Sequence, residues 1–266
     1  MNDISLDVCR SGDVINGASY YNCRHIYFRT NERLNDLFSN FDVNDKKVLS
    51  VIGSGDHAFY AYDRGAESVD LFDKNKITIY YYYLRVWLIK YLDMFYFDKE
   101  ISVSFLNHLL DLVKPETQIE IDTHRYWSEM IRLYGCNINY LFMCKNNLED
   151  YAIRDVSKIK KKIDYIPNFY NIDIASDIDI SHTYDVIIKS NITDHLNADY
   201  NKFIKYRNNL NNLLNSGGIV VSSNVLTSRI SPLEEKVFSE CFDIYPMDDV
   251  SDYSSITSPG FIYVKK

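Results

Sequence analysis

Hydrophobic residues fall in two alternating patterns along most of the chain. Short, largely apolar runs, typical of strands buried on both faces of a parallel sheet, lie at residues 48–52 and 69–72, and further strands are predicted at 163–170, 184–189 and 218–225. Between them, apolar residues recur with helical spacing at residues 57–64, 76–96, 197–215 and 232–241. This alternation of strand and helix predicts an α/β fold with a mostly parallel sheet.

Helical stretches interrupt this alternation at two places. Between the second expected helix and the third strand, further helices are predicted at residues 101–113, which Pro115 ends, and at 124–134 and 148–159. Before the first strand, Thr30 is the expected N-cap of an amphipathic helix at residues 31–40. We therefore expect an N-terminal helical extension at residues 1–45, followed by an α/β domain at 46–266 with a helical insertion at about 98–162.

The stretch KKVLSVIGSGDHAFYAYDRGAESVDLFDKN, residues 46–75, connects the first two expected strands. Its turn contains Gly53 and Gly55, which take positive φ readily and let a ligand approach the backbone. The helix behind the turn points free N–H groups into the same space. Asp73 ends the second strand, about 20 residues after Gly53, where a carboxylate can accept hydrogen bonds from both hydroxyls of a ribose. The stretch predicts a nucleotide-type site; the alternative is a plain βαβ unit with a structural glycine turn.

The same stretch resembles motifs I and II of the class I S-adenosylmethionine (SAM)-dependent methyltransferases. More narrowly, GSGDHAF and GAESVDLFDKN, with SNI at residues 190–192, are similar to the branch that contains the betaine-lipid aminocarboxypropyl transferases and related bacterial proteins. The resemblance covers residues 48–73 and, more loosely, 170–266. It implies SAM as the cofactor and a Rossmann-like, seven-stranded, mostly parallel sheet. That sheet would end in an antiparallel hairpin, which suits the runs at residues 242–245 and 261–266.

Some positions depart from the family pattern. Val51 stands where the methyltransferases usually carry an acid, and His57 stands where their third glycine falls, so Asp56 becomes the candidate for the contact to the methionine amine. Ala58 occupies the last glycine position of a nicotinamide-binding turn, which disfavours NAD. The residues expected to bind the cofactor are Gly53, Ser54, Gly55, Asp56, His57, Asp73, Lys74, Asn75, Asp173, Ile174, Ser190, Asn191 and Ile192.

Acidic residues also follow the third and fourth expected strands. In the methyltransferase pattern an acid after the third strand accepts a hydrogen bond from the adenine amino group; Asp173 is the best match, with Asp177 and Asp179 as competitors. The exit of the fourth strand would face the transferred group, and Asp194 or His195 is the candidate general base there. A simple polar position at a helix start is the alternative for His195.

The acceptor pocket is expected to draw on the N-terminal segment, because such segments often close over the cofactor in this fold class. A flap packed on the edge of the sheet is the alternative. The chain lacks the Pro-Pro-aromatic sequence that adenine-N6 methyltransferases carry after the fourth strand, which weighs against nucleobase methylation. The residues expected to contact the acceptor are Tyr20, Tyr21, Arg24, His25 and Tyr80.

The charge balance narrows the class of partner. The 266 residues carry a formal net charge of -8 with a pI of about 5.3, whereas nucleic-acid binding normally needs a basic footprint. The basic residues between 154 and 162 suit a solvated helix face. The 5 cysteines are scattered without zinc-ligand spacing, so we expect reduced thiols, no metal and a cytoplasmic location. No apolar window has the length of a membrane span, and the sequence leaves a homodimer open.

These patterns favour a SAM-dependent transferase that acts on a small molecule. Methyl transfer is placed slightly ahead because its fold class is so large, and 3-amino-3-carboxypropyl transfer is the alternative that the closer resemblance implies. A non-catalytic binding or scaffold protein is a further alternative, which Val51 and the lack of a clear base favour and intact Gly53, Gly55 and Asp73 disfavour. A nicotinamide-dependent dehydrogenase comes last.

Overall fold

The computed structural model describes residues 4–17, 25–30, 32–95, 97, 100–143, 156–190, 192, 199–224, 230–247 and 258–266. Within these residues a 7-stranded sheet forms in the order β5-β3-β2-β6-β7-β9-β8. Its strands are β2 (Lys47–Val51), β3 (Ser68–Phe72), β5 (Phe169–Tyr170), β6 (Tyr184–Ile188), β7 (Leu214–Asn224), β8 (Phe242–Pro246) and β9 (Ser258–Lys265).

The direction of the strands confirms the predicted fold class. Strands β5, β3, β2, β6 and β7 run parallel to one another, and β9 runs antiparallel to both β7 and β8. This is a Rossmann-like, mostly parallel sheet of the class I methyltransferase type, with the expected antiparallel hairpin at its end. The chain leaves β2 toward β3 and β5 and then returns to the other side of β2 as β6. Ligands of open α/β sheets bind at such a reversal, outside the carboxyl ends of the strands.

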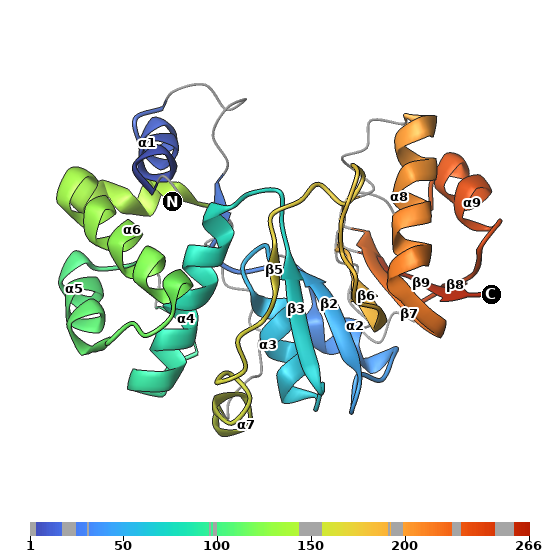
Figure 1. Cartoon of the computed structure of the whole chain (residues 1–266), viewed down its shortest axis with the longest axis horizontal. Coiled ribbons are helices and arrows are strands. Elements are labelled where there is room, and N and C mark those ends of the chain that lie inside the picture. Colours follow the sequence, from blue (N-terminus) through green and yellow to red (C-terminus); the bar gives the residue numbers. More distant parts are fainter. Residues whose placement is uncertain are drawn as a thin grey trace.

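Helices cover both faces of the sheet, and alternate residues of the strands pack into two hydrophobic cores, one on each face. Val48 of β2 packs in a core with α2 (Leu34–Ser39), α3 (Asp56–Asp63) and α4 (Ile77–Leu92). The next residue, Leu49, packs on the opposite face with α8 (Tyr200–Leu213) and α9 (Pro232–Phe238). Figure 1 shows α8 and α9 on one side of the strands and α4 on the other. The continuous apolar runs of the sequence are explained by this burial on two sides.

The N-terminal segment and the insertion form a helical layer beside α4 (Figure 1). Helix α1 (Ile4–Ile15) packs on α6 (Gln118–Tyr134) and on the 3₁₀ helix η1 (Gly135–Leu141), while α5 (Val103–Leu112) packs on α4 and α6. Strand β1 (Ile26–Tyr27) pairs in parallel with β4 (Phe142–Met143) in a small second sheet that the sequence did not predict. These contacts join the N-terminal extension to the helical insertion, which were predicted as separate parts of the chain. The predicted domain boundary after residue 45 stays a prediction.

Several element boundaries differ from the predicted ones for local reasons. Helix α6 begins six residues before the expected start at residue 124, because Thr117 and Glu120 form a capping box. Helix α2 begins at Leu34 with Arg33 as its N-cap, so the prediction that Thr30 caps this helix is wrong. The third strand is reduced to β5, which Pro167 precedes without a backbone N–H to donate. Of the helix expected at 148–159, only its end, within α7 (Ser157–Lys160), lies in the described residues.

Two further findings bear on function. In the part of the chain that the structure describes, none of the helices combines the length and the apolar character needed to cross a membrane. Across the same residues, no group of three or more His, Cys, Asp or Glu side chains is arranged to hold a metal ion.

Candidate functional site

The glycine turn lies where β2 ends and α3 begins, at the carboxyl edge of the parallel strands. Gly53 and Gly55 have φ angles of 51° and 86°, in the left-handed region that favours glycine. A Cβ on Gly55 would come within 3.0 Å of the Tyr82 ring, so this glycine is also needed for packing. A Cβ on Gly53 would meet nothing within 4 Å. The backbone at Gly53 therefore borders open space, as the predicted nucleotide site requires.

Asp73 follows β3 at the same edge and is bonded to the glycine turn. Its carboxylate accepts hydrogen bonds from the backbone N–H of Gly53, at 3.1 Å, and of Asn75, at 2.8 Å. The residue is partly exposed, as is Asn75, and the intervening Lys74 is exposed. Asn75 also donates to the backbone oxygen of His25, which brings the N-terminal segment to the exit of β3. The structure thus places Gly53, Asp73, Lys74, Asn75 and His25 together.

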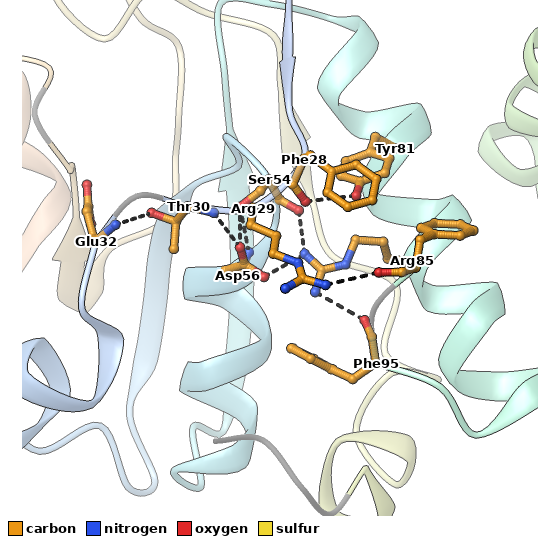
Figure 2. A network of polar contacts seen from close by, with 10 residues as sticks. Phe28, Arg29, Thr30, Glu32, Ser54, Asp56, Tyr81, Arg85 and Phe95 are labelled. Carbon is orange, nitrogen blue, oxygen red and sulfur yellow. Dashed lines mark hydrogen bonds and ion pairs between the residues drawn. The ribbon is translucent and has the colours of Figure 1, made fainter. Parts of the chain in front are cut away.

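Asp56, the first residue of α3, is fully buried in an ion pair with Arg85 of α4, with 2.6 Å between the charged atoms. Its other oxygen accepts from the Ser54 hydroxyl at 2.6 Å and from the Thr30 backbone N–H at 2.7 Å. Arg85 also donates to the backbone oxygens of Ser54 and Phe95. Figure 2 shows Thr30 and Arg85 approaching Asp56 from opposite sides. This network fixes the glycine turn against the N-terminal segment and α4.

The network also fixes the charge of Asp56. Burial alone would raise the pKa of this carboxyl, but the charge of Arg85 and the hydrogen bonds from Ser54 and Thr30 outweigh it, so the pKa lies below its ordinary value. Asp56 is therefore ionised, and the partners of both its oxygens are inside the protein. The predicted contact of Asp56 with the methionine amine stays a prediction, and this geometry makes Asp56 a residue that positions the turn.

A second buried cluster joins the N-terminal segment to α3 and β6. The Nε2 atom of His57 is hydrogen-bonded to Glu32, and the hydroxyl of Ser190 donates to the other carboxylate oxygen of Glu32. Glu32 and His57 are each 3% exposed. Nδ1 of His57 is buried and has no hydrogen-bond partner among the described residues. The two predicted site residues His57 and Ser190 are thus brought together by an acid that the sequence analysis did not single out.

Electrostatics couple the protonation states of this pair. Burial would lower the pKa of His57, but the carboxylates of Glu32 and, less strongly, Asp56 raise it above its ordinary value of 6.5. Burial would raise the pKa of Glu32, but the charge and hydrogen bond of His57 and the hydrogen bond from Ser190 lower it. Both shifts therefore favour the charged forms, a buried imidazolium–carboxylate pair.

This pair predicts how stability depends on pH. Because the folded-state pKa of His57 is raised, its contribution is fully present below the unfolded value of about 6.5 and is lost as the pH rises through the folded value. We expect the free energy of unfolding, measured by urea denaturation between pH 6 and 9, to fall over this range. The variant His57→Gln should show a shallower decline, and an identical slope in both proteins would contradict the assignment.

Ser190 lies directly after β6, at a turn with a φ of 54°, which is uncommon for a residue other than glycine. The preceding Lys189 is fully buried and forms an ion pair with Glu234 of α9, with 3.1 Å between the charged atoms. The Tyr263 hydroxyl donates to the same carboxylate oxygen of Glu234 at 2.6 Å. The exit of β6 is thus held from the α9 face while Ser190 faces Glu32.

The remaining residues predicted to bind the cofactor differ in how far they are buried. Asp173 is exposed after β5, with one oxygen bonded to the backbone N–H of Ala175, whereas Ile174 is buried in the core next to α8. Ile192 is partly buried and packs against the same core. Six predicted residues lie outside the described residues: Tyr20, Tyr21, Arg24, Asn191, Asp194 and His195.

Tyr80, predicted to contact the acceptor, is fully buried in the helical layer. Its hydroxyl donates to Asp7 of α1 at 2.9 Å, and its ring stacks on Tyr126 of α6 with 4.5 Å between the ring centroids. The structure therefore does not bring Tyr80 to the glycine turn, and its side chain joins α1 and α6 to α4.

Comparisons with known proteins identify no family for this chain. No protein-family model matches it, and no curated protein matches it either. Among solved structures, the N-methyltransferase NodS from Bradyrhizobium japonicum WM9 shares 8% identity at a TM-score of 0.42, with 100% of this chain and 99% of NodS covered. A TehB-like SAM-dependent methyltransferase from Corynebacterium glutamicum shares 11% identity at a TM-score of 0.41, with 98% and 97% covered. At these scores the likenesses assign no function, and the fold class rests on the strand order and directions described above.

Proposed function

We propose that the chain is a SAM-dependent transferase that methylates a small-molecule acceptor. The observation that carries this proposal is the position of Asp73. Asp73 is partly exposed and directly follows β3, beside the point where the strand order reverses. Its carboxylate is bonded to the backbone of Gly53, which borders open space. A ribose with its two hydroxyls on Asp73 and its sugar over the glycine backbone fits this arrangement.

The residues present suit the rest of an adenosine cofactor. Asp173 follows β5, next to the exit of β3, and would accept from the adenine amino group, while the first turn of α3 directs its backbone N–H groups toward the other end of the ligand. When bound, the cofactor supplies a sulfonium that makes its attached carbons electrophilic. The protein then needs to align the acceptor, exclude water and, for some acceptors, remove a proton.

The proposal extends to partners and location. A net charge of -8 opposes binding to nucleic acid, so we infer a small-molecule acceptor rather than DNA or RNA. The scattered cysteines suit a reducing compartment, and we propose that the protein acts in the cytoplasm.

Isothermal titration calorimetry of the purified protein with SAM, S-adenosylhomocysteine, methylthioadenosine and NAD in parallel tests the proposal. We expect tight binding of S-adenosylhomocysteine, the product that methyl transfer leaves, and weaker binding of methylthioadenosine. The reverse order would favour transfer of the aminocarboxypropyl group, which leaves methylthioadenosine. Binding of NAD alone would overturn the interpretation of the glycine turn. If none of the four ligands binds to the folded protein, a non-catalytic scaffold would be favoured.

A further inference from the structure

His57 has a buried polar atom whose hydrogen bond is not made within the described part of the protein. The Nε2 side of the ring is fixed by Glu32, whereas Nδ1 is enclosed without a partner. Buried polar groups in native proteins nearly always have a partner, because leaving one unmade costs about 1–3 kcal/mol. A ligand that supplies this partner would explain both the orphan atom and the elaborate support of the ring.

The position of His57 indicates where that ligand would lie. His57 is the second residue of α3, which begins directly after the Gly53–Gly55 turn, and Gly53 is bonded in turn to Asp73. A ligand whose ribose lies on Asp73 therefore extends over the glycine turn toward the first turn of α3. The backbone N–H groups of that turn and the positive end of the helix dipole favour an anion.

The charge of the ring agrees with an anionic partner. The groups that face His57 are Glu32 from the N-terminal segment and Asp56 from its own helix, and Asp56 is paired with Arg85 of α4. Their carboxylates keep the pKa of His57 above its ordinary value, which favours the protonated ring, and in that form Nδ1–H is a donor. The carboxylate of Asp56 is already bonded to Arg85, Ser54 and Thr30, and does not compete for this donor.

We propose that Nδ1 of His57, with its ring held by Glu32, binds the α-carboxylate of the amino-acid end of the cofactor. This assignment rests on the proposed use of SAM and deepens it. It places the protonated ring of His57 at the position where the family pattern has a glycine, and it makes the affinity for the cofactor depend on pH. Affinity should be full while His57 is protonated and should fall as the pH rises through the pKa of His57.

Two ligands separate this contact from the rest of the site. S-adenosylhomocysteine carries the amino-acid end, whereas methylthioadenosine has the same adenosine and sulfur without it. The variant His57→Gln keeps an N–H near the Nε2 position for Glu32 and removes the Nδ1 donor. By calorimetry at pH 7 we expect this variant to bind S-adenosylhomocysteine about tenfold more weakly or worse, the loss of one charge-assisted hydrogen bond, and to bind methylthioadenosine within about twofold of wild type.

A second variant tests the role of the acid. Glu32→Gln removes the charge that keeps His57 protonated, so the affinity for S-adenosylhomocysteine should begin to fall at a lower pH than in wild type. Methylthioadenosine binding should stay flat in both proteins between pH 6.5 and 9. A purely structural role for Glu32 would not shift the pH at which the affinity for S-adenosylhomocysteine begins to fall.

The outcomes are distinct. Equal losses for both ligands in His57→Gln, or no loss for either, would overturn the assignment. Should that variant fail to fold, a pH-independent preference of wild type for S-adenosylhomocysteine over methylthioadenosine would overturn it instead. Wild-type protein that binds neither ligand would refute the use of SAM itself, which is a failure of the proposed function rather than of the histidine contact alone.

Discussion

Replacing Asp56 by asparagine is expected to lower the free energy of unfolding by about 3–5 kcal/mol, the cost of leaving one partner of a buried ion pair uncompensated. Arg85 would remain fully buried with its charge and would lose the carboxylate that lies 2.6 Å away. The same substitution weakens the bonds that Ser54 and Thr30 make to this carboxylate. Urea denaturation followed by circular dichroism measures the change.

A surface pair of the same chemistry provides the control for Asp56→Asn. Glu129 and Arg132 form an ion pair on α6 with side chains 41% and 66% exposed. Solvent screens such pairs, so Glu129→Gln should change the free energy of unfolding by less than about 1 kcal/mol. Equal effects of the two substitutions would show that the Asp56–Arg85 pair does not brace the fold.

Replacing Asp73 by alanine is expected to weaken binding of both S-adenosylhomocysteine and methylthioadenosine by about 100-fold or more. Both ligands carry the ribose, and each loses two hydrogen bonds to a charged acceptor, worth about 1.5–3 kcal/mol apiece. This pattern differs from that expected for His57→Gln, which separates the two ligands. Calorimetry with each ligand in turn distinguishes the adenosine end of the site from its amino-acid end.

Asp164 provides a matched aspartate for the Asp73→Ala experiment. Its side chain is 74% exposed in a surface pair with Lys90, so Asp164→Ala should leave both affinities unchanged. Unchanged binding in Asp73→Ala, with the thermal transition of wild type, would refute the placement of the ribose and favour a scaffold role.

The unit β2–turn–α3–β3 could be predicted from the sequence because its signals are local. Doubly buried strands need continuous apolar runs, and the left-handed φ angles of Gly53 and Gly55 need glycine. The start of α6 had a local signal as well, since Thr117 and Glu120 stand in capping-box spacing. Strands β1 and β4 have two residues each, which is too short for any periodicity.

The buried polar clusters could not be predicted, because their partners are distant in the sequence and similar residues are common on surfaces. Arg85 lies 29 residues from Asp56, and Glu32 lies 158 residues from Ser190. Nothing in the local sequence marks Glu32 as buried. Tyr80 was expected to contact the acceptor, yet all the tyrosines at positions 80–83 are buried. The Tyr81 hydroxyl donates to the backbone of Phe28, so this run ties the helical layer to the N-terminal segment.

The pairing of β1 with β4 constrains the order in which the protein assembles during synthesis. Strand β1 precedes the glycine turn, yet its partner at Phe142–Met143 leaves the ribosome more than 100 residues later. Ser190, which bonds to Glu32, emerges later still. A nascent chain can form the β2–α3–β3 unit early, but the carboxylate–imidazolium cluster closes only when β6 is in place. Such long-range contacts slow folding, so the complete cluster should form late, after most of the chain has been made.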